Sequence, residues 1–213
     1  KVTAQFGNDS RSATVTVKIV NELNPGGIAD PDIGILKGPT DPNAGVVWLY
    51  PYDKTVFPKG IYPPELMWDG GAAGDEYYVR YKTKFVDIGI FTKVDPPSRF
   101  LLDEATWRTV TESGKGEDVQ LTVTRLVPGQ AKATPAVDNT WKSAPGALRG
   151  FVYYWSNSLG RVLRIDPGKG TAPEDFLLAA GISQPCSTCH TVSADGLTLV
   201  ISPELASMGA WLE

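Results

Sequence analysis

This chain of 213 residues has few cysteines, histidines and methionines, the residues that most often carry metal or redox chemistry. It contains two cysteines, one histidine and two methionines. A single histidine excludes two histidine ligands to one metal ion from the same chain. No stretch approaches about 18 uninterrupted apolar residues, which excludes a membrane-spanning helix. Basic residues are also few, since Lys and Arg number 20 against 24 Asp and Glu. Without a basic excess to replace counterions, a generic nucleic-acid binder is excluded as well.

Abundant turn residues favour a mainly β fold. The chain has 22 Gly and 17 Pro, and between them lie short runs that alternate apolar and polar residues, as in 77–82 and 119–124. Residues 45–168 are therefore predicted to form one β-sandwich. Within it, 151–155 is expected as a central strand and Arg161–Ile165 as its hairpin partner. The strand pattern resembles that of fibronectin type III and immunoglobulin-like modules, which implies a fold and nothing about function.

A β-hairpin is predicted for residues 1–22. Val2–Phe6 is expected as one strand and residues 7–10 as the turn. Residues 13–20 alternate mostly β-branched apolar residues with Thr and Lys and are expected as the second strand. The two strands resemble the last two of a bacterial immunoglobulin-like domain. Because a lone hairpin is only marginally stable in water, we expect it to pack on the next domain, on upstream sequence or on another subunit.

The remaining segments contain a linker and short helices. Residues 23–44, rich in Pro and Gly turns, are predicted to be the linker. Asp103 is expected to cap one short helix. Thr171 and Glu174 have the spacing of a capping box, so a second helix is expected to begin at Thr171. That helix opens a carboxy-terminal segment, 169–213, which contains both cysteines and the histidine.

One cluster points to chemistry: Cys186-Ser187-Thr188-Cys189-His190. In the order C-x-x-C-H, two thiols bond the two vinyl groups of a porphyrin, and the next residue supplies the proximal ligand to the iron. The chain's only cysteines and only histidine meet in this order, so we predict covalently attached haem c, held by Cys186 and Cys189 with His190 on the iron. A disulfide and a zinc site are the alternatives; the first lacks a βαβ context and the second lacks a fourth ligand.

The motif resembles that of c-type cytochromes, which implies one-electron transfer by a single haem. The rest of the chain does not match the small all-helical cytochrome c fold, so we expect the haem on a β-rich scaffold. Residues 190–200 contain Ser-x-Asp-Gly before an apolar strand, similar to the opening of WD40-like repeats in TolB-type propellers. The combination looks like uncharacterised bacterial cytochrome–propeller proteins. A tight turn before a strand also explains this sequence.

The two methionines are candidates for the sixth ligand of the iron. Met208 follows Ser202 and Pro203, which are suited to begin a short helix that would present it. Met67 lies in a probable strand of the sandwich. Gap-filling in a core is the usual role of methionine, and a sixth position that is open or held by water or another ligand is the remaining alternative.

Three functions follow from these patterns. The first is an electron carrier of the bacterial periplasm or cell surface that meets a redox partner protein, because covalent haem attachment takes place outside the cytoplasm. The second is a structural subunit of an extracellular fibre or surface assembly, a homo-oligomer joined by β-strand addition through residues 2–20. The third is a haem sensor or peroxidase-like enzyme with an open sixth position. No secretory leader is visible at Lys1, so we expect that it was removed or that the chain is a piece of a longer protein.

Overall fold

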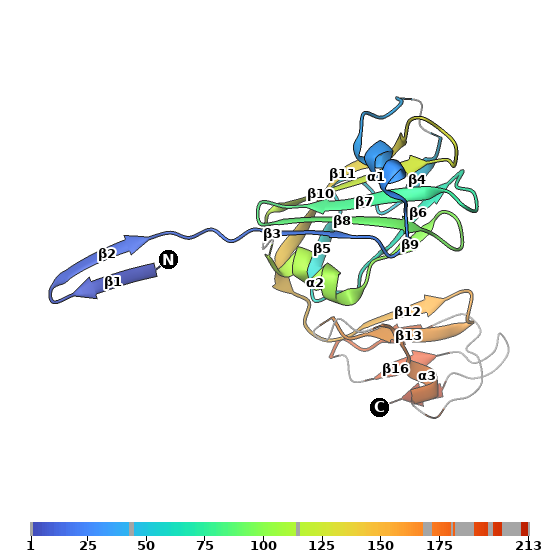
Figure 1. Ribbon diagram of the computed structural model, residues 1–213. Coiled ribbons are helices and arrows are strands. Elements are labelled where there is room, and N and C mark those ends of the chain that lie inside the picture. Colours follow the sequence, from blue (N-terminus) through green and yellow to red (C-terminus); the bar gives the residue numbers. More distant parts are fainter. Residues whose placement is uncertain are drawn as a thin grey trace. The chain divides into compact units, whose positions relative to one another are not determined.

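The protein is mainly β, as predicted, with short helices (Figure 1). The computed structural model describes residues 2–42, 45–113, 116–167, 172–179, 181, 190–195, 198–201 and 210–212. The chain divides into two compact units. Unit 1 comprises residues 1–57 and 63–144, and unit 2 comprises residues 58–62 and 145–213. The sequence-based boundary at residue 168 thus differs from the observed one, since strands expected in the sandwich belong to unit 2.

Six strands form the main sheet of unit 1, in the order β3-β8-β7-β10-β11-β5. Their bounds are Ile19–Leu23 (β3), Val56–Lys59 (β5), Glu76–Lys82 (β7), Val86–Lys93 (β8), Asp118–Leu126 (β10) and Thr134–Ala147 (β11). Neighbours from β8 to β11 are antiparallel, whereas β3 pairs with β8 in parallel, with Ile19 opposite Val86. The predicted alternation holds: Tyr77, Val79 and Tyr81 are all buried on one face of β7.

A smaller antiparallel sheet forms the second layer of unit 1. It consists of β4 (Val47–Tyr50), β6 (Glu65–Asp69) and β9 (Arg99–Leu101), in the order β4-β6-β9. The ring centroid of buried Trp68 in β6 lies 5.0 Å from that of Tyr77 in β7, so the two sheets share a core. This packing of one sheet on another confirms the predicted β-sandwich-like fold.

Helix α2 (Glu104–Ser113) contributes to the same core, and its start was predicted correctly. The Asp103 carboxylate accepts a hydrogen bond of 2.9 Å from the backbone N–H of Thr106, which is the expected cap. Trp107 of α2 packs edge-on against the ring of Phe57, with centroids 5.4 Å apart.

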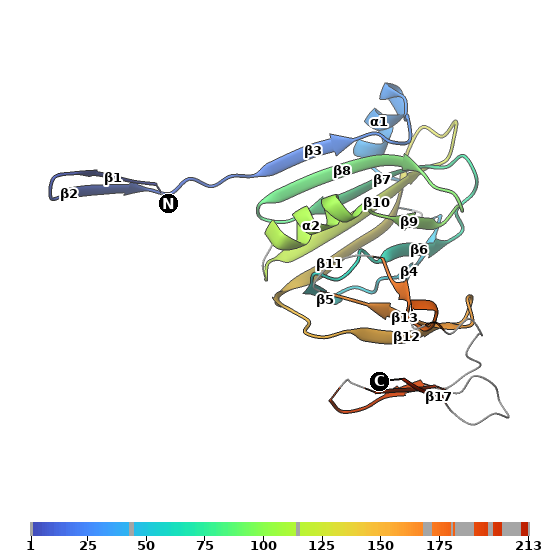
Figure 2. The ribbon, with the colours of Figure 1, turned by 90° about the horizontal axis from the view of Figure 1, so that it is seen from below.

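Helix α1 (Asp30–Lys37) covers the other face of the main sheet (Figure 2), whereas residues 23–44 were predicted to be a linker without a helix. Pro31 occupies its first turn, where a missing N–H costs nothing, and buried Leu36 packs against Tyr78 and Leu126. The Asp-Pro pair that suggested a turn therefore begins a helix. Tyr78, expected on a polar face, is consequently buried beneath α1.

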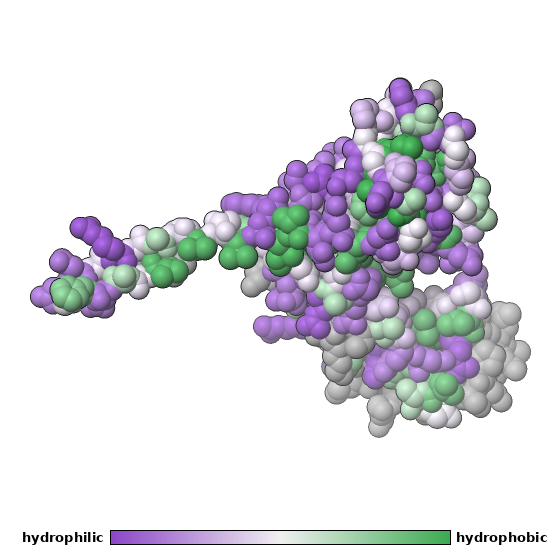
Figure 3. Space-filling view, in the orientation of Figure 1, coloured by the Kyte–Doolittle hydropathy of each residue, from purple (hydrophilic) through white to green (hydrophobic). Residues whose placement is uncertain are grey.

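The amino-terminal hairpin exists, but its second strand differs from the prediction. Strand β1 (Val2–Phe6) pairs with β2 (Asp9–Ala13), whereas residues 14–18 belong to no strand and the chain becomes regular again at β3. Hydrophobic side chains lie on the surface of this extension (Figure 3); Phe6 is 90% exposed, Val15 62% and Val17 72%. The alternation of residues 13–20 thus indicates strand propensity. Among the described residues, however, 14–18 has no neighbouring strand to pair with.

Unit 2 contains two three-stranded antiparallel sheets. The first has the order β12-β13-β14 and the second the order β15-β16-β17. Their bounds are Val152–Ser156 (β12), Arg161–Ile165 (β13), Glu174–Asp175 (β14), His190–Val192 (β15), Leu199–Ile201 (β16) and Ala210–Leu212 (β17). The β12–β13 hairpin agrees with the prediction, but β12 is an edge strand instead of a central one. Its apolar residues suggested a strand with neighbours on both sides. In the described sheet, β12 has a neighbouring strand, β13, on one side only.

A small core holds unit 2 together. It consists of three buried residues, Val162 of β13, Leu177 of helix α3 (Phe176–Ala179) and Leu199 of β16. Around them pack four partly buried residues: Tyr153, Trp155, Phe176 and Val192. Helix α3 is shorter than predicted, because Glu174 and Asp175 form β14 instead of a first helical turn. The Asp175 carboxylate, which accepts the Leu178 N–H at 2.9 Å, takes the capping role predicted for Thr171, a residue outside the described part.

Candidate functional site

The predicted haem motif lies in unit 2, at the start of its second sheet. His190 is the first residue of β15, and its backbone pairs with that of Ile201 in β16. Cys186, Cys189 and Met208 lie outside the residues that the structure describes. The structure therefore anchors the carboxy-terminal end of the motif in a regular sheet.

The chain after His190 makes a turn that ties β15 to β16. The Ser193 N–H donates to the Thr198 carbonyl at 2.9 Å, and the Thr198 N–H donates to Ser193 Oγ at 3.0 Å. The Ser193 hydroxyl in turn donates to the Asp195 carboxylate at 2.5 Å. The Ser-x-Asp pattern thus closes a turn before a strand, which is the simpler of its two sequence-based interpretations.

A cavity of about 640 Å³ lies beside β15, and we call it the β15 pocket. Its lining residues come from the segment leading into β12 and from β15 with its following turn: Gly150, Phe151, Val152, Tyr153, Thr191, Val192 and Asp195. Its volume lies within the roughly 300–1,000 Å³ of pockets that hold small molecules and cofactors. Thr191, the nearest lining residue in sequence, directly follows the predicted iron ligand.

Two aromatic residues of the pocket lining, Phe151 and Tyr153, pack against further side chains of unit 2. The ring centroids of Phe151 and Tyr153 are 6.4 Å apart, and Tyr153 packs edge-on against Phe176 at 5.0 Å. The Arg164 guanidinium lies 4.5 Å from the Phe151 centroid and 4.9 Å from that of Phe176, and it forms an ion pair with Glu174. Burial alone would lower the pKa of Arg164, but hydrogen bonds from it to Tyr153 and Glu174 raise that pKa overall.

These residues suit a porphyrin. A porphyrin is a flat and largely apolar ring system, and Phe151, Val152 and Val192 offer it apolar walls, while Tyr153 adds a ring with a polar tip. Sequence reasoning found the motif and missed these walls, because β12 is distant from the motif in sequence and only folding brings it near β15.

The structure places the two candidate sixth ligands differently. Met67 lies in β6 of unit 1, where it is half-buried and pairs through its backbone with Tyr50 and Arg99. Met208 falls outside the described residues, in the stretch between β16 and β17 of unit 2. Met67 and His190 thus belong to different units.

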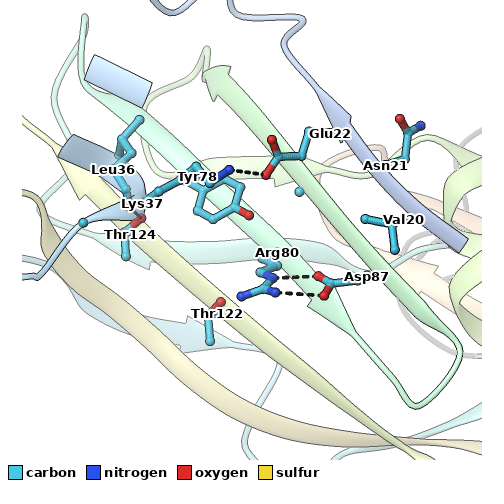
Figure 4. Close-up of a pocket in the computed structure, with 12 residues that line it drawn as sticks. Val20, Asn21, Glu22, Leu36, Lys37, Tyr78, Arg80, Asp87, Thr122 and Thr124 are labelled. Atoms are coloured by element: carbon cyan, nitrogen blue, oxygen red, sulfur yellow. Dashed lines mark hydrogen bonds and ion pairs between the residues drawn. The ribbon is translucent and has the colours of Figure 1, made fainter. Parts of the chain in front are cut away.

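A second pocket, in unit 1, was not foreseen from the sequence (Figure 4). We call this cavity of about 300 Å³ the Tyr78 pocket; strands β3, β7, β8 and β10 and the end of α1 line it. Two ion pairs cross it. Arg80 donates to both carboxylate oxygens of Asp87 at 2.7 and 2.8 Å, and Lys37 donates to Glu22 at 2.7 Å. Hydrogen bonding to Arg80 lowers the pKa of Asp87, and the bond to Glu22 raises the pKa of Lys37.

The β7–β8 hairpin alone makes the Arg80–Asp87 pair predictable, since these residues are diagonal neighbours across two adjacent antiparallel strands. The Lys37–Glu22 pair was not predictable, because it needs α1 and the parallel strand β3. Neither element was expected where the structure has it.

In comparisons with known proteins, no family model, no curated protein and no solved structure matches the chain. Among the described residues, no group of three or more His, Cys, Asp or Glu side chains is placed to hold a metal ion. Within the same residues, no helix is long and apolar enough to cross a membrane.

Proposed function

We propose that this chain is a single-haem c-type cytochrome that passes one electron at a time between partner proteins outside the bacterial cytoplasm. The observation that carries the proposal is the meeting of the chain's only two cysteines and only histidine in the order C-x-x-C-H. The β15 pocket, whose wall begins one residue after the motif, supports it. Bound haem iron supplies the redox chemistry by alternating between the ferric and ferrous states.

The residues of the chain divide the work of holding the haem. Cys186 and Cys189 form the thioether links, and His190 binds the iron. Phe151 and Val192 would give the ring apolar contacts on its inner side, and an apolar surrounding favours the less charged, ferrous form of the iron. The exposed position of Phe151, which is half solvent-accessible, leaves one edge of the site open to a redox partner protein.

Covalent haem is tested by producing the protein in a bacterial periplasm that carries the cytochrome c maturation machinery. Intact mass should exceed that of the polypeptide by one haem, and the pyridine haemochrome spectrum should be that of a haem with two thioether links. Replacing both cysteines, Cys186→Ala with Cys189→Ala, should abolish attachment. The matched control replaces the two residues between them, Ser187→Ala with Thr188→Ala, and should keep it. Bare polypeptide in the unaltered protein would refute the proposal.

A second candidate function rests on the amino-terminal extension. Every described residue from 2 to 21 is exposed, β1 and β2 pair with each other, and 14–18 carries the alternation of a strand without a ladder partner among the described residues. Such a segment is suited to add a strand to the sheet of another copy of the chain. We therefore propose assembly into a fibre or surface layer through residues 2–18 as a function compatible with haem.

The assembly proposal is tested by removing residues 1–17, which leaves β3 in the main sheet. The full chain should form oligomers in light scattering and analytical ultracentrifugation, and the shortened chain should be a folded monomer. Val15→Lys with Val17→Lys should act in the same way, because it puts two charges on the apolar face that an inserted strand would bury against the neighbouring copy. The control Thr14→Lys with Thr16→Lys alters the opposite face of the alternation. A monomeric full chain would refute the proposal.

A further inference from the structure

The Tyr78 pocket exists because one residue of the main sheet has no side chain. A β-carbon at Gly89 of β8 would lie 2.5 Å from Cε2 of Tyr78, so the tyrosine ring occupies the space above this glycine. The ring stacks on Phe91, with centroids 4.5 Å apart and planes 14° apart. The ring therefore forms a fixed floor, and the strands around it supply polar walls.

The hydroxyl group of Tyr78 is the feature that points to a ligand. Tyr78 is only 9% exposed, and it is among the residues that line the pocket. Figure 4 shows it between the Lys37–Glu22 and Arg80–Asp87 pairs, directed away from α1 toward β3. Burial raises the pKa of Tyr78, so the group stays a neutral donor and acceptor at physiological pH.

The walls offer hydrogen bonds of both kinds without a net charge. Among the lining residues, Lys37 and Arg80 balance Glu22 and Asp87; Lys18, which is outside the lining, also forms an ion pair with Asp87, at 3.5 Å. The guanidinium of Arg80 uses two of its N–H donors on Asp87, and the group has five. The hydroxyl of Thr122 also lines the pocket. A ligand with a full charge would have to disturb one of the two ion pairs, at a cost in desolvation.

We infer that the Tyr78 pocket is a binding site for one neutral polyhydroxylated ring, that is, a single monosaccharide unit. Each sugar hydroxyl both donates and accepts, which matches ion pairs whose donors and acceptors stand side by side. The cavity of about 300 Å³ is at the lower end of small-molecule pockets, so it has room for about one ring. The apolar face of a sugar would rest on the floor that Tyr78 provides. This site lies in unit 1 and is independent of the haem proposal.

The test is saturation-transfer NMR and calorimetry on the full chain with the methyl glycosides of glucose, galactose, mannose and N-acetylglucosamine. At least one glycoside should bind saturably. If the natural ligand is a glycan instead of a free sugar, an oligosaccharide that ends in the same unit should bind as well. Tyr78→Phe keeps the ring and removes the hydroxyl, so affinity should fall about three- to tenfold. Tyr52→Phe, an exposed tyrosine outside the pocket, is the matched control and should bind as the unaltered protein does.

Three results would overturn the inference. They are no saturable binding of any glycoside, equal affinity in the Tyr78→Phe variant, and binding of inorganic phosphate that competes with the glycosides. A circular-dichroism spectrum and melting temperature like those of the unaltered protein show that Tyr78→Phe is folded. If that variant is misfolded, Thr122→Val, which removes a different hydroxyl of the lining, replaces it in the same comparison.

Discussion

The core of unit 2 makes a sharp prediction from two adjacent leucines. Leu177 of α3 is 0% exposed and packs with Val162 and Leu199, whereas Leu178 is 60% exposed. Leu177→Ala removes a fully buried side chain from a core that draws on both sheets of unit 2. A buried Leu→Ala change costs about 2–5 kcal/mol, and we expect the upper half of that range, because α3 is only one turn long and has few other anchors.

The assay is hydrogen exchange followed by mass spectrometry, together with urea unfolding. In the Leu177→Ala variant, amides of β12, β13 and β16 should lose protection while those of β7, β8 and β10 keep it, since unit 1 has its own core. Leu178→Ala should leave the protection of these amides unchanged and should alter the free energy of unfolding by no more than about 0.5 kcal/mol. Equal effects of the two substitutions, or equal loss of protection in both units, would refute the packing and the division into units on which the argument rests.

Three further predictions concern charge and the iron. Asp75 is 2% exposed and accepts hydrogen bonds from Arg125 at 2.7 Å, so Asp75→Ala, which leaves a buried cation, should destabilise unit 1 by about 3–5 kcal/mol in urea unfolding. Hydrogen bonding lowers the folded-state pKa of Asp87 below its unfolded value, so its contribution to stability is present at neutral pH and is lost as pH falls from about 4 through the folded pKa. Asp87→Asn should remove that part of the acid dependence of the melting temperature, and an unchanged dependence would contradict it. If Met208 ligates the iron, Met208→Leu should abolish the methionine-to-iron absorption band and open the site to carbon monoxide, while Met67→Leu leaves the band intact. A band lost only in the Met67→Leu variant would reverse the assignment, and carbon monoxide binding by the unaltered protein would favour the sensor or peroxidase-like alternative.

Local sequence patterns predicted the elements of the sandwich well where those elements depend on residues close together in the sequence. The alternation in β7 and the cap at Asp103 depend on residues within a few positions, and both are found. Residues 14–18 have equally good β alternation and form no strand, because a ladder also needs a partner. Helix α1 was missed for the opposite reason: its Asp30-Pro31 start is typical of turns as well as of first helical turns.

The candidate sites differ in the same way. The C-x-x-C-H motif is contiguous, so its order alone predicts haem chemistry. The walls of the β15 pocket come from Phe151 and Tyr153, whose proximity to Val192 follows from the packing of unit 2 around Leu177. The Tyr78 pocket was beyond sequence reasoning altogether, since it needs the parallel strand β3, the end of α1 and the missing side chain of Gly89 together.

The parallel pairing of β3 with β8 has a consequence for how the protein is made. β3 leaves the ribosome long before β8, and no hairpin can bring the two together, because parallel neighbours require a long connection. During synthesis the antiparallel strands β7 and β8 can pair locally, while β3 must wait for them in an extended form. The docking of β3 is thus a late step of folding, and until then its backbone hydrogen-bonding groups are open to pairing with other chains.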